Sequence, residues 1–343
     1  MEVSISFQYQ KGVGIVHLNR PSVLNSLNFT MIVRLRDQLL LWKEDPEVHF
    51  VILKSDLENT FCAGGDLKEI FEAARRQDTR FLKLFFEVEY GLNQIIHSYP
   101  KPYLSLMNGI AMGGGLGISV QGSHRIVTDN SVLAMPEVFI GFFPDAGGSY
   151  FLNKCPGKIG LMVGLSGYRM NAADALYTGI ATHYVPQENF SLLYQALSET
   201  DIRAHPQEGI RAILEIFAAP CPQISLLKEH RQLIDEYFEE EDTATLIAGL
   251  RLTKNVWLQG VRKKMEDASP LSLVITHRLL KEAKGLPFSE AMAGELRLAL
   301  NFFESKEVLE GIRSVVIDKD RTPKWIYPSV ADVPEDVVRG YFG

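Results

Sequence analysis

Two short glycine-rich turns constrain the fold of this 343-residue chain more than any other feature of its sequence. One is Ala-Gly-Gly-Asp at residues 63–66, and the other is Gly-Gly-Gly at residues 113–115. Each follows a stretch typical of a strand and precedes a stretch typical of a helix. Because glycine lacks a Cβ, main-chain N–H groups in such turns can approach a ligand closely. A helix that begins there adds its positive end, so the two turns predict anion-binding architecture.

The N-terminal pattern predicts an α/β fold. Residues 3–8 and 14–18 are rich in β-forming residues on either side of a Lys-Gly turn, which is typical of a hairpin. Asn28 can cap a helix, and residues 48–53 form an apolar run expected of a strand buried on both faces. The two glycine turns suggest a loose repeat of a strand-strand-helix unit without a strict period. From about residue 190 helical patterns dominate, so we predict a core at 1–195 and a mostly helical module at 196–343.

Composition limits the classes of function. The chain has 46% hydrophobic and 22% charged residues, as expected of a soluble protein with a sizeable core, and its net charge of −7 argues against binding nucleic acid. No apolar run is long enough to cross a membrane, and no basic stretch precedes an apolar one at the N-terminus. Three cysteines at irregular spacing favour a reducing compartment, with the cytoplasm as the default.

Three acids are candidates for chemistry. Glu89 falls on the apolar stripe of a helix predicted over residues 81–97, where an unpartnered acid is costly. Glu137 follows Pro136 in a predicted helical turn, and Asp145 precedes a Gly-Gly pair. Each also has a structural interpretation: Glu89 as a boundary residue that reaches solvent or pairs with a lysine, Glu137 as an acid favoured by the helix dipole, and Asp145 as a helix N-cap. Asp66 is likewise a natural N-cap.

Several well-known site patterns are absent from the sequence. It contains no Gly-x-Ser-x-Gly elbow, no Walker phosphate loop and no histidine or cysteine spacing typical of a metal site. A dinucleotide-binding glycine pattern begins at residues 113–117 but fails where Ile118 or Val120 stands in place of the third glycine. Two N–H donors on separate turns and two carboxylates on later loops instead suit acyl transfer at a thioester carbonyl.

The order and spacing of several motifs resemble the crotonase (enoyl-CoA hydratase/isomerase) superfamily. They are Asn-Arg-Pro at 19–21, Leu-Asn-Ser-Leu at 24–27, Phe-Cys-Ala-Gly-Gly-Asp at 61–66, Asn-Gly at 108–109, Gly-Gly-Gly at 113–115, Pro-Glu at 136–137 and Pro-Asp-Ala-Gly-Gly at 144–148. The resemblance implies a crotonase-type spiral of strand-strand-helix units. A closer similarity, to the branch that hydrolyses 3-hydroxyisobutyryl-CoA, extends into Glu-Gly-Ile-Arg at 310–313 and residues 318–325.

The resemblance also implies roles for individual residues. The N–H groups of Gly65 and Gly114 would form an oxyanion hole, Glu137 would be the catalytic acid, Asp145 would assist it, and Glu89 would contact the acyl end of the substrate. The residues expected along the CoA moiety are Val23, Leu24, Ser26, Ala63, Gly64, Gly65, Asp66 and Leu67.

Hydratases resemble Gly-Gly-Gly-Cys-Glu at the second glycine turn, and the last residue of that motif is an acid. This chain departs from the pattern, because Gly117 takes the place of that acid. Losing that acid while gaining Asp145 moves the predicted attack from the β-carbon to the carbonyl carbon. Glu137 then acts as general base or as nucleophile through a mixed anhydride, and the sequence leaves this choice open.

The sequence thus predicts hydrolysis of a short branched 3-hydroxyacyl-CoA thioester, with 3-hydroxyisobutyryl-CoA as first choice and without a metal or redox cofactor. The partner is the acyl-CoA substrate, and neither nucleic acid nor membrane is expected. An enoyl-CoA hydratase or isomerase and a catalytically idle scaffold are the alternatives. Homo-oligomerisation stays open, as does a mitochondrial location if the chain is a processed eukaryotic protein.

Overall fold

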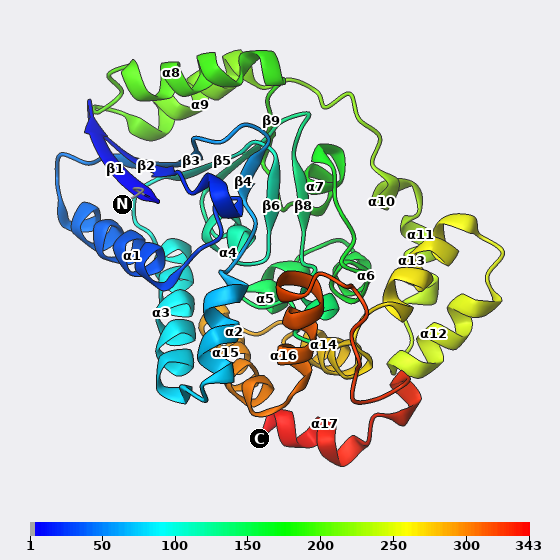
Figure 1. The fold of residues 1–343 in the computed structure, drawn as a ribbon. Helices are drawn as coiled ribbons and strands as arrows, with labels where there is room; N and C mark the ends of the chain where they lie inside the picture. The colour runs from blue at the N-terminus through cyan, green and yellow to red at the C-terminus, as the bar shows by residue number, and fades with distance from the viewer. Residues whose placement is uncertain (1–3) are drawn as a thin grey trace. The chain divides into compact units, whose positions relative to one another are not determined.

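A computed structural model describes residues 4–343 of the chain, which divides into two compact units (Figure 1). The sheet unit comprises the chain up to Gly65, Gly91–Leu133 and Met170–Lys228. The helical unit comprises Asp66–Tyr90, Ala134–Arg169 and Glu229–Gly343. The two units interleave along the sequence, so neither corresponds to one continuous segment. The division into domains at residue 195 stays a prediction.

The larger sheet lies in the sheet unit. Its strands pair in the order β1 (Ile5–Gln10), β2 (Val13–Leu18), β3 (Phe50–Ser55), β5 (Tyr103–Met107), β7 (His124–Val127) and β9 (His183–Tyr184). The first two strands form an antiparallel hairpin, as predicted, although Val3 of the predicted strand lies outside the described residues. The other pairings are parallel, which confirms the α/β class predicted from the order of strands and helices.

Helices cover both faces of this sheet, because successive side chains of each strand point to opposite faces and in β3 both sets are mainly apolar. Ile52 and Leu104 pack in one core with helices α8 (Phe190–Glu199) and α9 (Pro206–Phe217), which cover one face in Figure 1. On the opposite face Gly14 lies directly against the indole of Trp42 from helix α1 (Phe29–Glu44). A sheet covered on both faces needs apolar residues at consecutive positions, and this is why the strands read as continuous apolar runs.

The sequence also predicts one buried strand over residues 103–112, and this prediction is wrong in one respect. The strand is broken at Asn108 and Gly109 into β5, in the larger sheet, and β6 (Ile110–Met112), in a smaller sheet ordered β4 (Thr60–Cys62), β6 and β8 (Val132–Ala134). Gly109 has a φ of 90°, and a Cβ there would lie 2.0 Å from the carbonyl carbon of Asn59. Only glycine fits this crossing, which directs the chain from one sheet to the next.

The remaining helices follow from local capping and apolar stripes. Asn28 caps α1 by accepting a hydrogen bond from the Met31 N–H, as predicted. The other helices with residues in the sheet unit are α4 (Gly114–Val120), α7 (Ala172–Thr178) and α10 (Leu226–Glu229). The helical unit contains α2 (Leu67–Arg75), α3 (Thr79–His97) up to Tyr90, α5 (Gly148–Leu152), α6 (Ile159–Ser166), α11 (Arg231–Tyr237), α12 (Thr243–Leu252), α13 (Val256–Glu266), α14 (Pro270–Glu282), α15 (Phe288–Glu304), α16 (Glu307–Ile312) and α17 (Glu335–Phe342).

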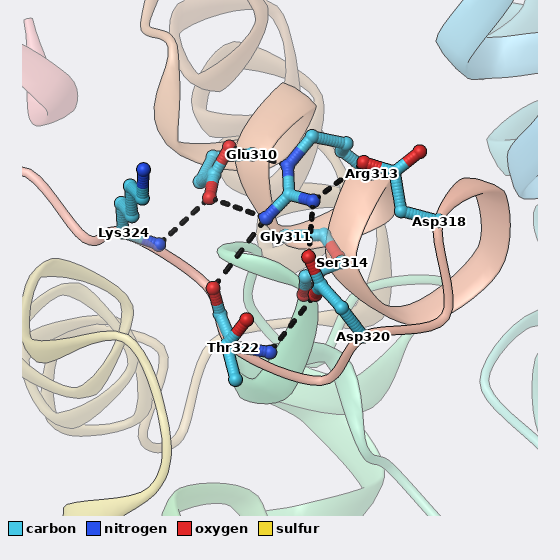
Figure 2. A network of polar contacts seen from close by, with 8 residues as sticks. All are labelled: Glu310, Gly311, Arg313, Ser314, Asp318, Asp320, Thr322 and Lys324. Carbon is cyan, nitrogen blue, oxygen red and sulfur yellow. Dashed lines mark hydrogen bonds and ion pairs between the residues drawn. The ribbon is translucent and has the colours of Figure 1, made fainter.

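Arg313 organises the segment that follows α16, as Figure 2 shows. Its guanidinium donates hydrogen bonds to both oxygens of Glu310 at 2.9 Å and to the carboxylates of Asp318 and Asp320 at 2.6 Å. Glu310 also accepts a hydrogen bond from the Lys324 N–H at 2.7 Å. One planar cation therefore ties residues 318–324 back to the end of the helix. Among residues 4–343 no helix is both long and apolar enough to cross a membrane.

Candidate active site

The two glycine turns lie side by side within the sheet unit. Cys62 of β4 pairs with Ala111 of β6, so the turns at residues 63–65 and 113–115 leave neighbouring parallel strands at the same edge. A Cβ on Gly64, which has a φ of 105°, would lie 3.1 Å from the Met112 carbonyl oxygen and 3.6 Å from the Gly114 nitrogen. The close approach of the two backbones explains why both turns are built from glycine.

The loop at residues 20–27 runs beside the first of these turns. The Ala63 N–H donates to the Leu24 carbonyl at 3.0 Å, and the Leu27 N–H donates to the Gly64 carbonyl at 2.8 Å. Val23 and Leu24 are exposed by 37% and 48%, which is unusual for apolar side chains on a tightly held loop. The structure thus brings together the sheet-unit residues expected along CoA.

Asn25, which the sequence analysis did not single out, holds this loop in place. Its fully buried side chain accepts a hydrogen bond from the Arg20 N–H at 2.7 Å and donates to the Ser55 hydroxyl at 2.8 Å and the Phe61 carbonyl at 3.0 Å. Its backbone φ is 58°, a left-handed conformation that asparagine tolerates better than most residues. An Asn in a Leu-Asn-Ser-Leu turn is the signal that could have marked it.

Asp66 and Leu67 begin the helical unit. The Asp66 carboxylate accepts hydrogen bonds from the Lys68 and Glu69 N–H groups at 3.1 and 3.2 Å, so it caps α2 as expected. This structural role is confirmed. Contact between these two residues and CoA stays a prediction.

Glu89 lies on α3, buried as its position on the apolar stripe predicted. It is 3% exposed, and Phe85 and Leu92 on the same stripe are fully buried. The structural alternative in which it reaches solvent is therefore wrong. Its neighbour Tyr90, also buried, donates a hydrogen bond from its hydroxyl to Oδ2 of Asp145 at 2.8 Å.

Glu137 opens the 3-10 turn Glu137–Ile140, directly after Pro136 as predicted. It is only 6% exposed, and within residues 4–343 its Oε2 has no hydrogen-bond partner. A buried carboxyl oxygen without a partner is costly, and such atoms cluster where a substrate supplies the missing contact. Helix α16 backs this turn closely, because a Cβ on Gly311 would lie 2.2 Å from the Ile140 carbonyl carbon.

Asp145 does not cap the helix that follows it, which corrects one structural interpretation. Helix α5 begins at Gly148 behind Gly147, while the Asp145 carboxylate instead accepts the hydrogen bond from Tyr90. Helix α5 ends at Leu152, and Asn153 is its C-cap. The Asp145 side chain is thus oriented by α3 rather than by its own turn.

Asp145 and three other acids of the helical unit interact electrostatically. Burial raises the pKa of Asp145 to about 6, against an opposing hydrogen bond from Tyr90. Burial, and then repulsion from Asp145, hold the pKa values of Glu89 and Glu137 well above their usual range. Burial raises the pKa of Glu295 to about 8. Burial and mutual repulsion therefore favour the neutral, protonated form of the acids in this cluster.

Glu295 is the fourth acid, and the sequence analysis missed it. It lies on α15, fully buried, and its carboxylate accepts hydrogen bonds from the Gly147 N–H at 2.8 Å and the Ser149 N–H at 2.9 Å. Glu295 lies three residues after Met292 and three before Leu298, and both of these are buried. It is therefore an acid on an apolar stripe. The same signal had identified Glu89 and could have found it. Among the described residues no group of three or more His, Cys, Asp or Glu side chains could hold a metal ion.

Comparison with known proteins places this arrangement in a family. A sequence model described as enoyl-CoA hydratase/isomerase matches residues 13–342. The chain belongs to the enoyl-CoA hydratase/isomerase family. Members that are similar to it include a protein from Xenopus tropicalis named "3-hydroxyisobutyryl-CoA hydrolase, mitochondrial", 38% identical over 96% of this chain and 86% of that protein. The protein of that name from Homo sapiens is 36% identical over the same shares.

Solved structures of the enoyl-CoA hydratase/isomerase family share the fold. One, described as a carnitinyl-CoA dehydratase from Mycobacterium thermoresistibile, has a TM-score of 0.92, 35% sequence identity and coverage of 99% of this chain and 96% of that chain. Another, described as an enoyl-CoA hydratase from Rhodobacter sphaeroides, has a TM-score of 0.91 and 32% identity, covering 99% of this chain and 97% of that one. The predicted crotonase-type fold with a helical C-terminal part is confirmed.

Proposed function

We propose that the chain hydrolyses 3-hydroxyisobutyryl-CoA to the free hydroxy acid and CoA. The observation that carries this proposal is the identity of 36–38% over 96% of the chain with relatives named for that reaction. The site agrees with it, since a cluster of buried acids around Asp145 suits an addition of water that must move protons. The chain is an acyl-CoA thioester hydrolase.

In the direct route the oxygen of water attacks the thioester carbonyl carbon, and the carbon–sulfur bond breaks as the thiolate leaves. In the anhydride route a carboxylate oxygen of Glu137 attacks that carbon and displaces the thiolate, and water then cleaves the anhydride to release the hydroxy acid and restore the Glu137 carboxylate. Glu137 takes the proton of water or acts as the nucleophile, and Asp145 gives a proton to the leaving thiolate. Burial raises the pKa of both carboxyls, and repulsion from Asp145 adds to the rise at Glu137. The pair can therefore hold one proton, and the mechanism requires that proton on Asp145 while Glu137 is ionised.

Glu89 would contact the acyl end of the substrate. Burial and the neighbouring Asp145 keep its pKa well above the usual range, which favours the neutral form of its carboxyl. A neutral carboxyl can donate a hydrogen bond to the substrate hydroxyl without placing a second charge beside Asp145. Its burial among apolar side chains of α3 also suits a short branched acyl group.

The glycine turns of the sheet unit would bind the thioester and the CoA moiety. The N–H groups of Gly65 and Gly114 would stabilise the oxyanion, and each such donor contributes about 10²- to 10³-fold in rate. The exposed side chains of Val23 and Leu24, beside Ala63, would pack along CoA. Ser26, Gly64, Asp66 and Leu67 complete the proposed CoA-binding set.

Hydration of an enoyl-CoA is the second candidate, favoured by the printed descriptions of the solved structures as a hydratase and a dehydratase. Addition of water across a double bond needs two acids placed around the α- and β-carbons. Gly117, buried within α4, has no side chain to supply the one that hydratases carry at this place. Hydrolysis is therefore preferred.

A panel of acyl-CoA thioesters with and without a 3-hydroxyl group tests the proposal. Free thiol is measured after addition of the protein to each substrate. We expect the fastest release from 3-hydroxyisobutyryl-CoA and slower release from its analogue without the hydroxyl. Equal rates for both analogues would contradict the proposed contact of Glu89 with the hydroxyl.

The compartment and assembly of the protein belong to the same proposal. The relatives carry "mitochondrial" in their names, which supports the mitochondrial matrix over the cytoplasm. Turnover of a valine-derived acyl-CoA would fit that location. Independence from a metal or redox cofactor and assembly into homo-oligomers stay predictions.

A further inference from the structure

The turn that carries Asp145 is held in an unfavourable backbone conformation. Ala146 has a φ of 52° and Gly147 a φ of 89°, so two consecutive residues are left-handed. For alanine this conformation costs about 1–2 kcal/mol, and it persists only where the surroundings impose it. Ala146 is fully buried, and no side chain of the turn itself caps α5, because the N-cap residue is Gly147.

Glu295 supplies the missing contacts from another part of the chain. Its Oε2 accepts the Gly147 N–H at 2.8 Å, and its Oε1 accepts both the Ser149 N–H at 2.9 Å and the Ser149 hydroxyl at 2.5 Å. Both carboxyl oxygens are therefore committed to Gly147 and Ser149, which follow the strained Ala146. Such multiple contacts fix the turn more tightly than a single cap would.

The same helix also fixes the chain before Asp145. The ring of Phe302, on α15, packs against the rings of Phe142 and Phe143 at centroid distances of 5.4 and 5.5 Å. Helix α15 therefore contacts the chain on both sides of Asp145, through the Phe302 ring before it and through the Glu295 carboxylate after it.

The choice of a buried acid for this contact needs a reason. A neutral side chain caps α7, α13 and α14 from within the chain's own turn, through Asn171, Asn255 and Ser269. A fully buried acid is more costly than these, above all beside three other acids. Costly polar groups of this kind are concentrated at functional sites. On this argument the contact serves the geometry of Asp145 as well as the stability of α5.

We propose that Glu295 is a positioning residue, which sets the place of the Asp145 carboxyl by clamping residues 147–149. This inference rests on the proposed function, in which Asp145 transfers a proton during thioester hydrolysis. Tyr90 then orients the side chain of Asp145, while Glu295 fixes its backbone. The clamp would make α15, in the helical part after residue 196, a necessary part of the site.

Two substitutions separate the chemistry of the carboxyl group from its reach. Glu295→Gln keeps the shape of the side chain but leaves an NH₂ group facing one of the N–H donors, while Glu295→Asp keeps the carboxyl group but shortens the side chain. Asp174→Asn is the matched control, because Asp174 is also buried and clamps a distant turn, accepting from the Ser225 hydroxyl at 2.8 Å and the Leu227 N–H at 3.1 Å. We expect both Glu295 variants to lower kcat of thiol release by about tenfold or more, with KM changed by less than about threefold.

A second readout does not depend on activity. The carbon-13 signal of the Asp145 carboxyl is titrated by NMR in the wild type, in Glu295→Asp and in Asp174→Asn. In Glu295→Asp we expect the midpoint to move to higher pH, because a displaced Asp145 loses the hydrogen bond from Tyr90. In the control the midpoint stays where it is. If the wild type releases no thiol at all, the proposed function fails, but this titration still decides the role of Glu295.

The outcome that overturns the proposal is a Glu295 variant with a lowered Tm, like the control, but with the kcat and Asp145 midpoint of the wild type. Glu295 would then be only a structural cap of α5. If neither Glu295 variant folds, Ser149→Ala removes one of the three contacts and leaves the two backbone donors. An unchanged midpoint and kcat in that variant would likewise overturn the proposal.

Discussion

The hydroxyl of Tyr90 donates a hydrogen bond to Oδ2 of Asp145 at 2.8 Å, and both side chains are buried. This bond favours the ionised carboxylate and opposes the effect of burial on the pKa of Asp145. We therefore expect Tyr90→Phe to raise that pKa above about 6 and to move the alkaline limb of the kcat/KM profile for thiol release, where Asp145 loses the proton that it donates, to higher pH. The measurement is a pH–rate profile of the two proteins.

Tyr103→Phe is the control for this prediction. Tyr103 is equally buried but donates its hydroxyl to the Ile118 carbonyl at 3.1 Å in the sheet unit. Each substitution should cost about 1 kcal/mol of stability through a lost hydrogen bond. A shift of the alkaline limb in both variants, or in neither, would contradict the role given to Tyr90.

Glu137→Gln should lower kcat of thiol release by about 10²- to 10⁴-fold, the usual effect of removing a general base or nucleophile. The amide cannot take a proton from water or attack the carbonyl. Affinity for CoA itself, measured by calorimetry, should change little, since the residues expected along CoA are elsewhere. A variant that keeps wild-type thiol release would remove Glu137 from the mechanism.

Asp145→Asn should change how stability depends on pH. The ordinary pKa of Asp145 is 3.8 and its folded value about 6, so ionisation disfavours the folded state. The neutral Asp145 carboxyl thus contributes about 3 kcal/mol to the free energy of unfolding. This contribution is complete below about pH 4 and is lost as the pH rises through 6. The variant should therefore gain stability relative to the wild type between pH 4 and 7. Urea unfolding at several pH values measures this, and a constant difference would count against it.

Gly311→Ala should destabilise the protein and impair catalysis together, because its Cβ would lie 2.2 Å from the backbone of Ile140 at the end of the Glu137 turn. We expect a loss of about 1–3 kcal/mol, as for overpacking of a core. Gly294→Ala on α15 is the control, since among the described residues no heavy atom beyond its chain neighbours and the adjacent helix backbone lies within 4 Å of its added Cβ. That substitution should stabilise the helix by about 0.5–1 kcal/mol. Thermal unfolding and thiol release of both variants provide the comparison, and a Gly311→Ala protein as stable as the wild type would contradict it.

Much of the sheet unit could be predicted because its determinants are local. The Asn28 cap, the hairpin and the apolar run of β3 depend on neighbouring residues, and all three are present in the structure. The break at Gly109 was not predictable in the same way. It depends on the backbone of Asn59, fifty residues earlier in the chain, coming within contact of the glycine.

The acids of the site show the same limit. Glu89 could be found from its own helix, whose apolar stripe it interrupts. Tyr90 could not, because its role depends on Asp145, 55 residues later, and an N-cap was the local expectation for that aspartate. Glu295 lies 146 residues from the serine that it contacts, so only the folded chain reveals what it holds.

The central claim is that attack occurs at the thioester carbonyl rather than at a carbon–carbon double bond. One assay decides it: purified protein is added to 3-hydroxyisobutyryl-CoA, with free thiol and the absorbance of the conjugated enoyl thioester recorded in the same sample. We predict stoichiometric thiol release with no change in the enoyl absorbance. An increase in enoyl absorbance with the thioester intact would mean that the protein dehydrates this substrate, and the proposed hydrolysis would be wrong.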